Sequence, residues 1–188
     1  MTNGVFSEYE LRAMGIKFKS GEEYKTASCV GSCEESMEAK VVTKSCRGVV
    51  IKTTVKGTGK GTLNLSMHMP YDIYKQAYGM GLDTLIDGVS AYGQNSVHEA
   101  FSITQQLFDE DGVEKFKAYP NCIIMSGVAN KTTNGAEEVA ELELEISVMP
   151  DEYGNGVYEA LVSELSDETL KTQWMTKFEP SMVQTDNA

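Results

Sequence analysis

Residues 141–148 read ELELEISV and alternate between apolar and polar side chains over their whole length. A period of two is typical of a β-strand that buries one face and exposes the other to water. The pattern therefore predicts a strand whose wet side holds three glutamates in a row, about 7 Å apart. The apolar set is Leu142, Leu144, Ile146 and Val148, and the polar set is Glu141, Glu143, Glu145 and Ser147.

The row of glutamates costs free energy, so its presence needs an explanation. Two neighbouring carboxylates at this spacing repel each other by about 0.6 kcal/mol in water, and by more where solvent is restricted. Threonine, lysine or glutamine would keep the strand soluble without this repulsion. Two interpretations follow: a solvated acidic face, or a surface that is acidic for a purpose.

Other acidic residues gather in the same part of the chain. Residues 99–168 contain 3 basic and 16 acidic residues, residues 1–98 contain 11 basic and 10 acidic residues, and the formal net charge is −12. A net-acidic chain is not a conventional DNA-binding module, because phosphate contacts need lysine and arginine. The asymmetry favours head-to-tail association or a surface that repels anions, with solubility as the simpler alternative.

Length and composition predict a single domain, residues 1–188, with a core of its own. No apolar run approaches the roughly 20 residues of a membrane span. The N-terminal sequence MTNGVFSEYELR lacks the pattern of a signal peptide, so we expect folding in a reducing cytoplasm without membrane association. Four cysteines are expected to be free, buried or half-buried thiols rather than zinc ligands: Cys29, Cys33, Cys46 and Cys122.

Most of the remaining chain also has strand patterns. Strands are predicted at residues 36–43, 49–56, 62–69, 101–108 and 113–127, with a turn at residues 44–48 between the first two. The glycine-rich stretch KGTGKG, residues 56–61, is expected to be a hairpin turn between two of these strands, and DEDG, residues 109–112, to be another turn. Residues 159–188 are expected to be partly helical at best.

One segment changes to a helical period. Residues 70–80, PYDIYKQAYGM, begin with proline and reach Gly79 near their end, as a short helix does. Ile73, Ala77 and Met80 lie on one helical face. The segment therefore predicts a short amphipathic helix that covers one side of the sheet.

No combination of residues predicts catalysis. KGTGKGT lacks the spacing of a phosphate-binding loop, and DEDG and DEYGNG lack that of a calcium loop. His68 and His98 are too few for a metal site and have no nucleophile at a diagnostic spacing. His68 is expected to form structural hydrogen bonds. We expect no enzyme, no metal and no cofactor.

Three stretches together resemble the major tail proteins, or tail tube proteins, of long-tailed bacteriophages. They are GKGTLNLSMHMPYDIYKQAYGM (59–80), KAYPNCIIMSG (117–127) and EEVAELELEISVMPDEYGNGVYEA (137–160), and the resemblance covers about residues 36–165. It implies a mainly β fold, a β-sandwich or half-barrel with one short flanking α-helix. It also implies a hexameric ring and head-to-tail stacking of rings into a β-lined, acidic channel for DNA delivery into the host.

The resemblance further implies a virion protein of the tail, assembled in the host bacterial cytoplasm. Its partners would be further copies of itself, the tape-measure protein and the tail terminator and tip proteins. Glu141, Glu143 and Glu145 are predicted to face the lumen, because carboxylates repel phosphates whereas a lysine-lined wall would hold the DNA. Residues 1–35 and 173–188 are predicted to be arms that contact neighbouring subunits.

Two alternatives stay open. The first keeps the fold and makes the chain a tube protein of a contractile tail, a tail-like bacteriocin or a secretion system, which would need a sheath. The second is a monomeric β-sandwich module that binds glycan or cell wall. An exposed aromatic platform would support that module, and Tyr71, Tyr74 and Tyr78 are its candidates.

Overall fold

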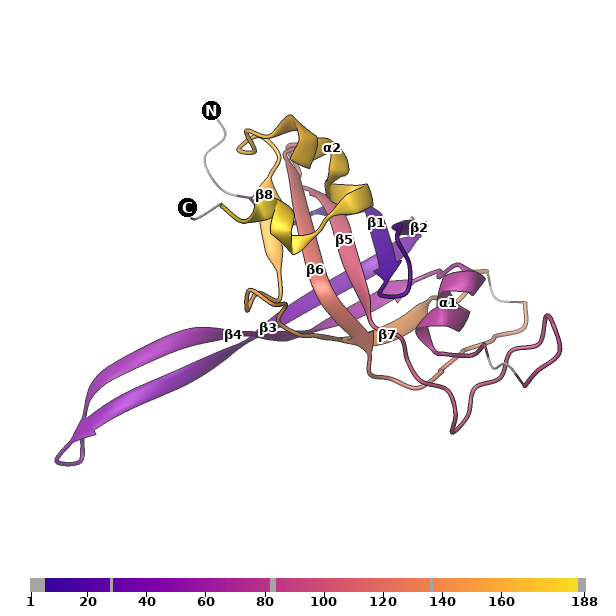
Figure 1. Cartoon of the computed structure of the whole chain (residues 1–188), viewed down its shortest axis with the longest axis horizontal. Helices are drawn as coiled ribbons and strands as arrows, with labels where there is room; N and C mark the ends of the chain where they lie inside the picture. Colours follow the sequence, from indigo (N-terminus) through magenta and orange to yellow (C-terminus); the bar gives the residue numbers. More distant parts are fainter. Residues whose placement is uncertain (1–5, 28, 82–83, 136, 186–188) are drawn as a thin grey trace.

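The computed structural model describes residues 6–27, 29–81, 84–135 and 137–185. Within these residues the chain is mainly an antiparallel sheet, in the strand order β2-β1-β5-β6-β7-β4-β3, with β8 paired to β6 (Figure 1). The strands are β1 Glu10–Phe18, β2 Lys25–Ala27, β3 Val30–Cys46, β4 Val49–Met67, β5 Phe101–Phe108, β6 Glu114–Ile124, β7 Leu142–Val148 and β8 Tyr158–Leu161. The helices are α1 Tyr71–Ala77, α2 Glu168–Lys177 and a 3-10 turn at Pro180–Val183.

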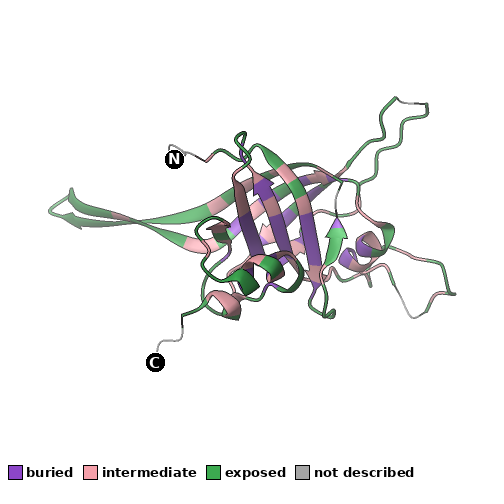
Figure 2. Ribbon diagram, turned by 90° about the horizontal axis from the view of Figure 1, so that it is seen from above, coloured by how far each residue is buried: buried purple, intermediate pink, exposed green. Residues whose placement is uncertain are grey.

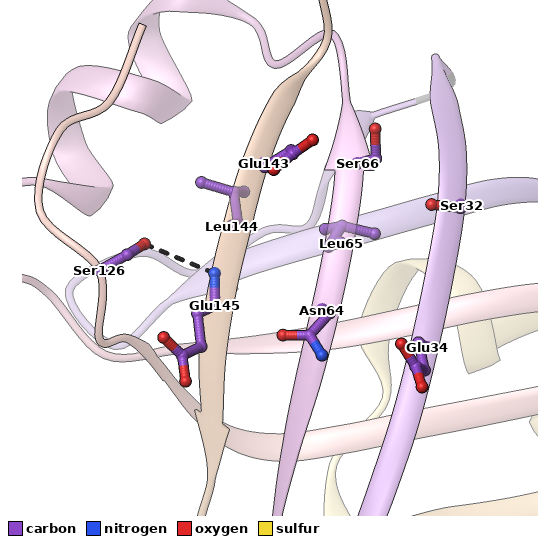
Figure 3. Close-up of a pocket in the computed structure, with 9 residues that line it drawn as sticks. All are labelled: Ser32, Glu34, Asn64, Leu65, Ser66, Ser126, Glu143, Leu144 and Glu145. Carbon is purple, nitrogen blue, oxygen red and sulfur yellow. Dashed lines mark hydrogen bonds between the residues drawn. The ribbon is translucent and has the colours of Figure 1, made fainter.

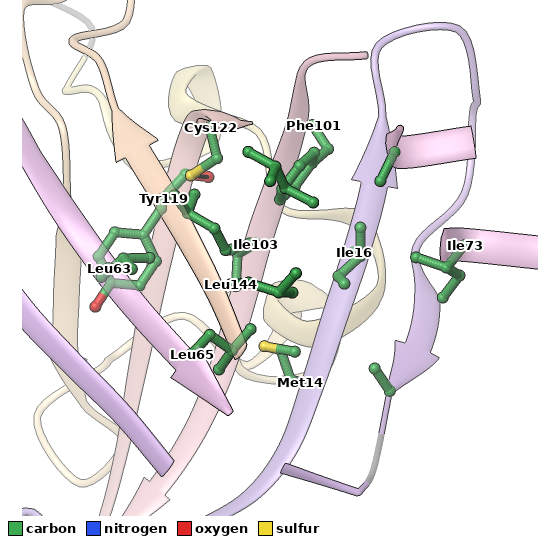
Figure 4. Close-up of a cluster of buried hydrophobic side chains, with 14 of the residues drawn as sticks. Met14, Ile16, Leu63, Leu65, Ile73, Phe101, Ile103, Tyr119, Cys122 and Leu144 are labelled. Carbon is green, nitrogen blue, oxygen red and sulfur yellow. Dashed lines mark hydrogen bonds between the residues drawn. The ribbon is translucent and has the colours of Figure 1, made fainter. Parts of the chain in front are cut away.

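The main core lies inside the curve of this sheet. Strand β1 approaches β3 across the core but does not pair with it in the described residues, so the sheet is not a closed barrel. Alternate residues of the strands point inward, as their period of two requires. Helix α1 adds Ile73 and Ala77 to the same cluster. Figure 4 shows part of this core, including Met14, Ile16, Leu63, Leu65, Ile103 and Leu144.

The predicted strands at residues 101–108 and 113–127 and the helix at residues 70–80 are confirmed as β5, β6 and α1. Strand β5 pairs with β6 from Phe108 opposite Glu114 to Phe101 opposite Cys122. The turn between them follows Asp109, whose Oδ1 accepts hydrogen bonds from the backbone of residues 111 and 113. The mainly β class is therefore confirmed.

The expectation of a single helix is wrong, because the C-terminal part forms a second one. Helix α2 begins after Asp167, whose side chain accepts hydrogen bonds from the backbone N–H groups of the next turn. Leu170 and Trp174 lie one turn apart and pack with Phe178 over Phe116 on the outer face of β6. The other positions of α2 are largely polar, so its helical period is weak in the sequence.

The glycine-rich stretch is not the predicted turn. Strand β4 continues through it, and β3 and β4 are joined at Arg47 and Gly48, both with positive φ, within the predicted turn at residues 44–48. Met37 pairs with Gly61 and Ala39 pairs with Gly57, so residues 58–60 form a bulge opposite a single residue of β3. Glycine is common in bulges as well as in turns, so the glycine-rich pattern predicted a turn where the structure has a bulge.

The bulge has a close neighbour in the turn that precedes β8. A Cβ atom on Gly156 would overlap the carbonyl oxygen of Gly59, and one on Gly59 would lie 2.6 Å from the carbonyl oxygen of Gly154. Glycine is therefore required on both sides of this contact. Gly59 also has a φ of 71°, which side chains rarely adopt.

This contact gives a first prediction. Gly156→Ala forces the turn and the bulge apart and is expected to lower the free energy of unfolding by about 1–3 kcal/mol. Gly57→Ala is the matched control, because a Cβ there meets no atom within 4 Å and no positive φ is involved. It is expected to be neutral or to stabilise by up to about 1 kcal/mol. Urea unfolding measures both, and equal midpoints for the two variants would contradict the contact.

Beyond the bulge, β3 and β4 leave the body as a two-stranded ribbon, residues 39–58, which we call the arm (Figure 1). The arm is exposed along almost its whole length, as Figure 2 shows in green. It pairs with no other strand in the described chain, because β7 joins β4 only from Gly61 to Met67. The arm thus has two free edges and two free faces.

Candidate functional site

Strand β7 confirms the alternation that its sequence predicts. Leu144, Ile146 and Val148 are buried in the main core, and Glu143 and Glu145 are exposed on the opposite side. Glu141 is exposed just before the strand begins, and its carboxylate accepts a hydrogen bond from the hydroxyl of Ser66. Two of the three predicted glutamates therefore stand on the strand, and the third lies at its entrance.

The acidic side of β7 continues across two neighbouring strands. Glu145 pairs with Asn64 of β4, and Asn64 pairs with Glu34 of β3. The next row runs from Glu143 to Ser66, which is adjacent to Ser32 in the register. We call this surface, with Glu34, Asn64, Ser66, Glu143 and Glu145 on it, the acidic face (Figure 3).

A shallow hollow of about 460 Å³ lies on the acidic face. Its floor includes Leu65 and Leu144, and Ser126 reaches it from the loop after β6, where its hydroxyl accepts a 3.4 Å hydrogen bond from the backbone N–H of Glu145 (Figure 3). No lysine or arginine is among the nine residues that line it. The surface is therefore polar and negative, and it offers no cation to a phosphate group.

Glu34 is the member of the acidic face that sequence reasoning missed. Residues 32–38 alternate in burial, with Cys33, Glu35 and Met37 half-buried and the residues between them exposed, but the charged Glu35 at an inward position hides this alternation in the sequence. In β7, by contrast, every inward position is apolar, so the period of two is visible in the sequence. The pairing of β3 with β4 that brings Glu34 beside Asn64 is non-local and is not visible in the pattern.

A second charged cluster lies inside the molecule and is satisfied internally. Lys117 on β6 is only 5% exposed, and its Nζ lies 2.6 Å from Glu35 Oε2, 2.7 Å from Glu8 Oε1 and 3.3 Å from Glu159 Oε1. Tyr119 also donates a hydrogen bond of 2.8 Å to Glu35. These residues join the segment before β1 to β3, β6 and β8. We call them the buried ion cluster.

The ionisation of this cluster follows from its contacts. Burial acts to lower the pKa of Lys117, but the hydrogen bonds with Glu35 and Glu8 outweigh it and raise this pKa above its ordinary value. Burial acts to raise the pKa of Glu8, but Lys117 and Lys115 hold it below its ordinary value. Every charge has a partner, so the cluster ties four segments together and leaves no free acid or base.

The histidines and cysteines show no further site. His98 Nδ1 lies 2.8 Å from the carbonyl oxygen of Ile124, and exposed His68 uses its backbone N–H to bond Cys29. All four cysteines are free, and contrary to expectation Cys29 and Cys46 are exposed. Among the described residues no three His, Cys, Asp or Glu side chains are grouped to hold a metal ion. No described helix is both long and apolar enough to span a membrane.

The three tyrosines near α1 do not form an exposed platform. Tyr78 is fully buried and packs edge-on against His98, with 5.0 Å between the ring centroids. Tyr74 is half-buried beside it, and only Tyr71 is largely exposed. A sugar ring therefore has no row of aromatic faces on which to stack here.

The predicted terminal arms are partly built into the subunit itself. Residues 10–18 form β1, with Met14, Ile16 and Phe18 in the core, and Trp174 of α2 and Phe178 after it are buried against Phe116 of β6. Their contact with neighbouring subunits stays a prediction. Residues 1–5, 28 and 186–188 of these segments lie outside the described residues.

No family model matches the sequence, and no curated protein matches it. Among solved structures, the chain is similar to a chain from the baseplate of the anti-feeding prophage, with a TM-score of 0.46 and 9% identity over 88% of this chain and 100% of the other. It is also similar to a chain from the tube-terminating cap of the anti-feeding prophage, with a TM-score of 0.48 and 11% identity over 86% of this chain and 100% of the other. Likenesses of this size assign neither a function nor an assembly state.

Proposed function

We propose that the chain is the tube subunit of a phage tail. Six copies form a ring, rings stack head to tail, and the acidic face lines the channel through which DNA passes. The acidic face is the observation that carries this proposal, because it spans three strands, is exposed, and has no cation among the residues that line its hollow. Glu143 and Glu145 take the lumen position there, with Glu141 at the rim.

DNA must move through such a channel without binding to its wall. Lysine or arginine on a channel wall would replace the counterions of the phosphates and hold DNA with a non-specific Kd of about 10⁻⁴ to 10⁻⁶ M. Carboxylates repel the phosphates instead, so the wall keeps the polymer away from itself. A polar acidic sheet therefore suits a conduit, and it offers nothing to a reaction.

The arm supports assembly independently of charge. A two-stranded ribbon is marginally stable alone in water, and this one exposes large apolar side chains such as Val41 and Val55, 59% and 61% exposed. Free strand edges also invite pairing with another chain. Packing between copies would cover these surfaces, and a contact that repeats without closing along one axis yields a filament.

The proposal extends to the partners and the location of such a subunit. The tube would meet a tape-measure protein inside it and terminator and tip proteins at its ends, in the tail of a virion assembled in the host cytoplasm. A contractile tail, a tail-like bacteriocin or a secretion system would use the same subunit inside a sheath. Binding of a sheath protein to the outer surface of the tube is what separates that alternative. The buried Tyr78 disfavours the glycan-binding module.

Electron microscopy of the purified full-length protein at high concentration tests the proposal. Rings with six-fold symmetry, or hollow tubes, are the expected result. A protein that stays monomeric at all concentrations and ionic strengths would overturn it, and retention on a glycan matrix by that monomer would favour the binding module.

A further inference from the structure

The two faces of the arm differ in chemistry. Lys40 lies directly opposite Lys56, and Lys44 lies directly opposite Lys52, so four lysines occupy one face of the ribbon. Val42 and Thr54 pair with each other between the lysines on the same face, whereas the Val41–Val55 and Thr43–Thr53 pairs point to the other face. The arm is thus an amphipathic ribbon with one basic face and one largely apolar, β-branched face.

The basic face is costly for an isolated ribbon. Two ammonium groups about 5 Å apart repel each other by about 1 kcal/mol in water, and like charges directly opposite each other destabilise a strand pair. The described chain offers these lysines no carboxylate partner, since its ion pairs involve other basic residues. The arm therefore fits a partner that is acidic and also presents apolar contacts.

Such a surface lies at the opposite end of the body. The end of β7 near the arm is Val148, opposite Gly61, and the far end is Leu142, opposite Met67. Beyond that far end, the loop before β7 lies well away from the arm (Figure 1). It borders a hollow of about 800 Å³, which we call the distal hollow. Its lining is Ser66, His68, Lys131, Thr133, Glu138, Val139, Ala140, Glu141 and Glu143.

The distal hollow offers what the arm requires. Three carboxylates line it against one lysine, and Val139 is 81% exposed at its border. The complementarity also holds for the whole chain. Residues 39–58 contain four lysines, one arginine and no acidic residue, and removing these five charges from the net charge of −12 leaves −17 on the rest of the chain.

We propose that the arm of one copy docks into the distal hollow of the next copy, with Lys40 and Lys44 on Glu138 and Glu141 and with Val42, on the same face of the ribbon, toward Val139. This inference rests on the proposed tube assembly and names the contact that links successive copies. The arm spans about 30 Å, from eight or nine residues per strand at about 3.3 Å each. Arm and hollow lie at opposite ends, so every docked copy still presents a free arm and a free hollow, as a filament requires. Glu34, Glu143 and Glu145 lie nearer the arm's own base than Glu141 does, and they stay open toward the channel.

A second copy fits the arm better than nucleic acid does. Phosphates would neutralise the lysine face but would leave Val42 on that face exposed to water. The distal hollow provides carboxylates and an exposed valine together. The arm is accordingly a protein-docking element, and DNA binding by it is the rival outcome of the test.

Disulfide trapping tests the contact in the full-length chain. Cys46 is exposed next to the turn of the arm, and Cys29 is removed as Cys29→Ser. Val139→Cys then places a thiol at the border of the distal hollow. Mild oxidation of this variant is expected to give a series of covalent oligomers beyond the dimer on a non-reducing gel. The same chain with Val139 retained is expected to stop at monomers and dimers, and a stop at dimers in both chains would overturn the proposal.

Charge reversal adds a readout that does not depend on the disulfide. Lys40→Glu with Lys44→Glu is expected to reduce the trapped oligomers at least tenfold, and adding Glu138→Lys with Glu141→Lys to the same chain is expected to restore them. Lys19→Glu with Lys177→Glu, an equal change of charge outside the arm, is the matched control and is expected to leave them unchanged. An equal decrease of trapped oligomers in the control would show that net charge, and not the arm, controls association, and it would overturn the proposal.

The outcomes separate this inference from the proposed function. Tubes without trapped oligomers would refute the docking contact alone, and trapped oligomers without tubes would refute the tube alone. Binding of a short DNA duplex is the rival result. If the wild-type monomer binds the duplex, the variant Lys40→Glu with Lys44→Glu does not, and no oligomers are trapped, then the arm is a nucleic-acid site and the proposal is overturned.

Discussion

Tubes assembled from the variant Glu34→Lys with Glu145→Lys are expected to retain DNA that wild-type tubes release. Both residues flank Asn64 in one row of the acidic face, and both are exposed, so the substitutions are expected to change stability by less than about 0.5 kcal/mol. The wall of the channel would gain two lysines per subunit. Non-specific affinity in the range of about 10⁻⁴ to 10⁻⁶ M should appear, and it should fall steeply as salt is raised.

Co-sedimentation of the tubes with a short duplex at several salt concentrations measures this effect. Glu152→Lys with Glu164→Lys makes the same change of charge in the exposed segments on either side of β8, and it should leave DNA in the supernatant. If the control tubes retain DNA as strongly as the Glu34→Lys with Glu145→Lys tubes, the acidic face does not line the channel. Release of DNA by both variants would argue against the channel wall as well.

Removing the cation of the buried ion cluster is expected to have the largest effect on stability. Lys117→Met keeps most of the volume of the side chain but leaves Glu35 and Glu8 facing a thioether in a largely buried site. Breaking one side of a buried ion pair costs about 3–5 kcal/mol. Chemical unfolding at pH 7 is expected to show a loss of this size. Adding Glu35→Gln should recover part of it, because one uncompensated charge is then removed.

The free energy of unfolding of the wild type is expected to depend on pH through the buried ion cluster. In the wild type the pKa of Glu8 is lowered, so its contribution to stability is present above the unfolded-state pKa of about 4.3 and is lost as the pH falls through the folded-state value. The pKa of Lys117 is raised, so its contribution is present below about pH 10.4 and is lost only as the pH rises through its higher folded value. The wild type should therefore be most stable between these limits.

Lowering the pH below 7 should relieve the destabilisation of Lys117→Met, whereas lowering it far enough to protonate Glu8 weakens the ion cluster of the wild type. Protonation removes the uncompensated carboxylate charge, so the difference in unfolding free energy between wild type and Lys117→Met should shrink as the pH falls from 7 to 5. Lys115→Met is the control, because Lys115 is more exposed and leaves Lys117 in place. A difference that stays constant with pH would mean that packing, rather than charge, explains the loss.

The parts of the fold that the sequence predicts well are those with local patterns. Strand β7, the hairpin of β5 and β6, and helix α1 each carry their own period and their own turn residues. Helix α2 was expected only as partial helicity within residues 159–188, because only Leu170 and Trp174 mark its buried side and its stability comes from packing on Phe116 of β6. The two strands of the arm and the turn between them were predicted, but the continuation of β4 into the body was missed for a related reason. Glycines inside β4 resemble a turn, and only the register with β3 shows that they form a bulge.

The residues of the candidate site are also of two kinds, those that a local pattern predicts and those that contacts between distant segments place. Glu143 and Glu145 follow from the alternation of one strand, whereas Glu34 joins them only through pairing across β4. Lys117 alternates with Phe116 and Ala118, so its sequence indicates a wet position. The structure places it inward, because carboxylates from three other segments surround it. Contacts between distant segments decide such positions, and a single sequence does not display them.

A density map of the assembled tube at side-chain resolution will show whether the acidic face lines the channel. Glu34 and Glu145 of every subunit are expected on the wall of the lumen, with Glu143 beside them. Placement of these carboxylates on the outer surface of the tube, or sealed between rings, would contradict it.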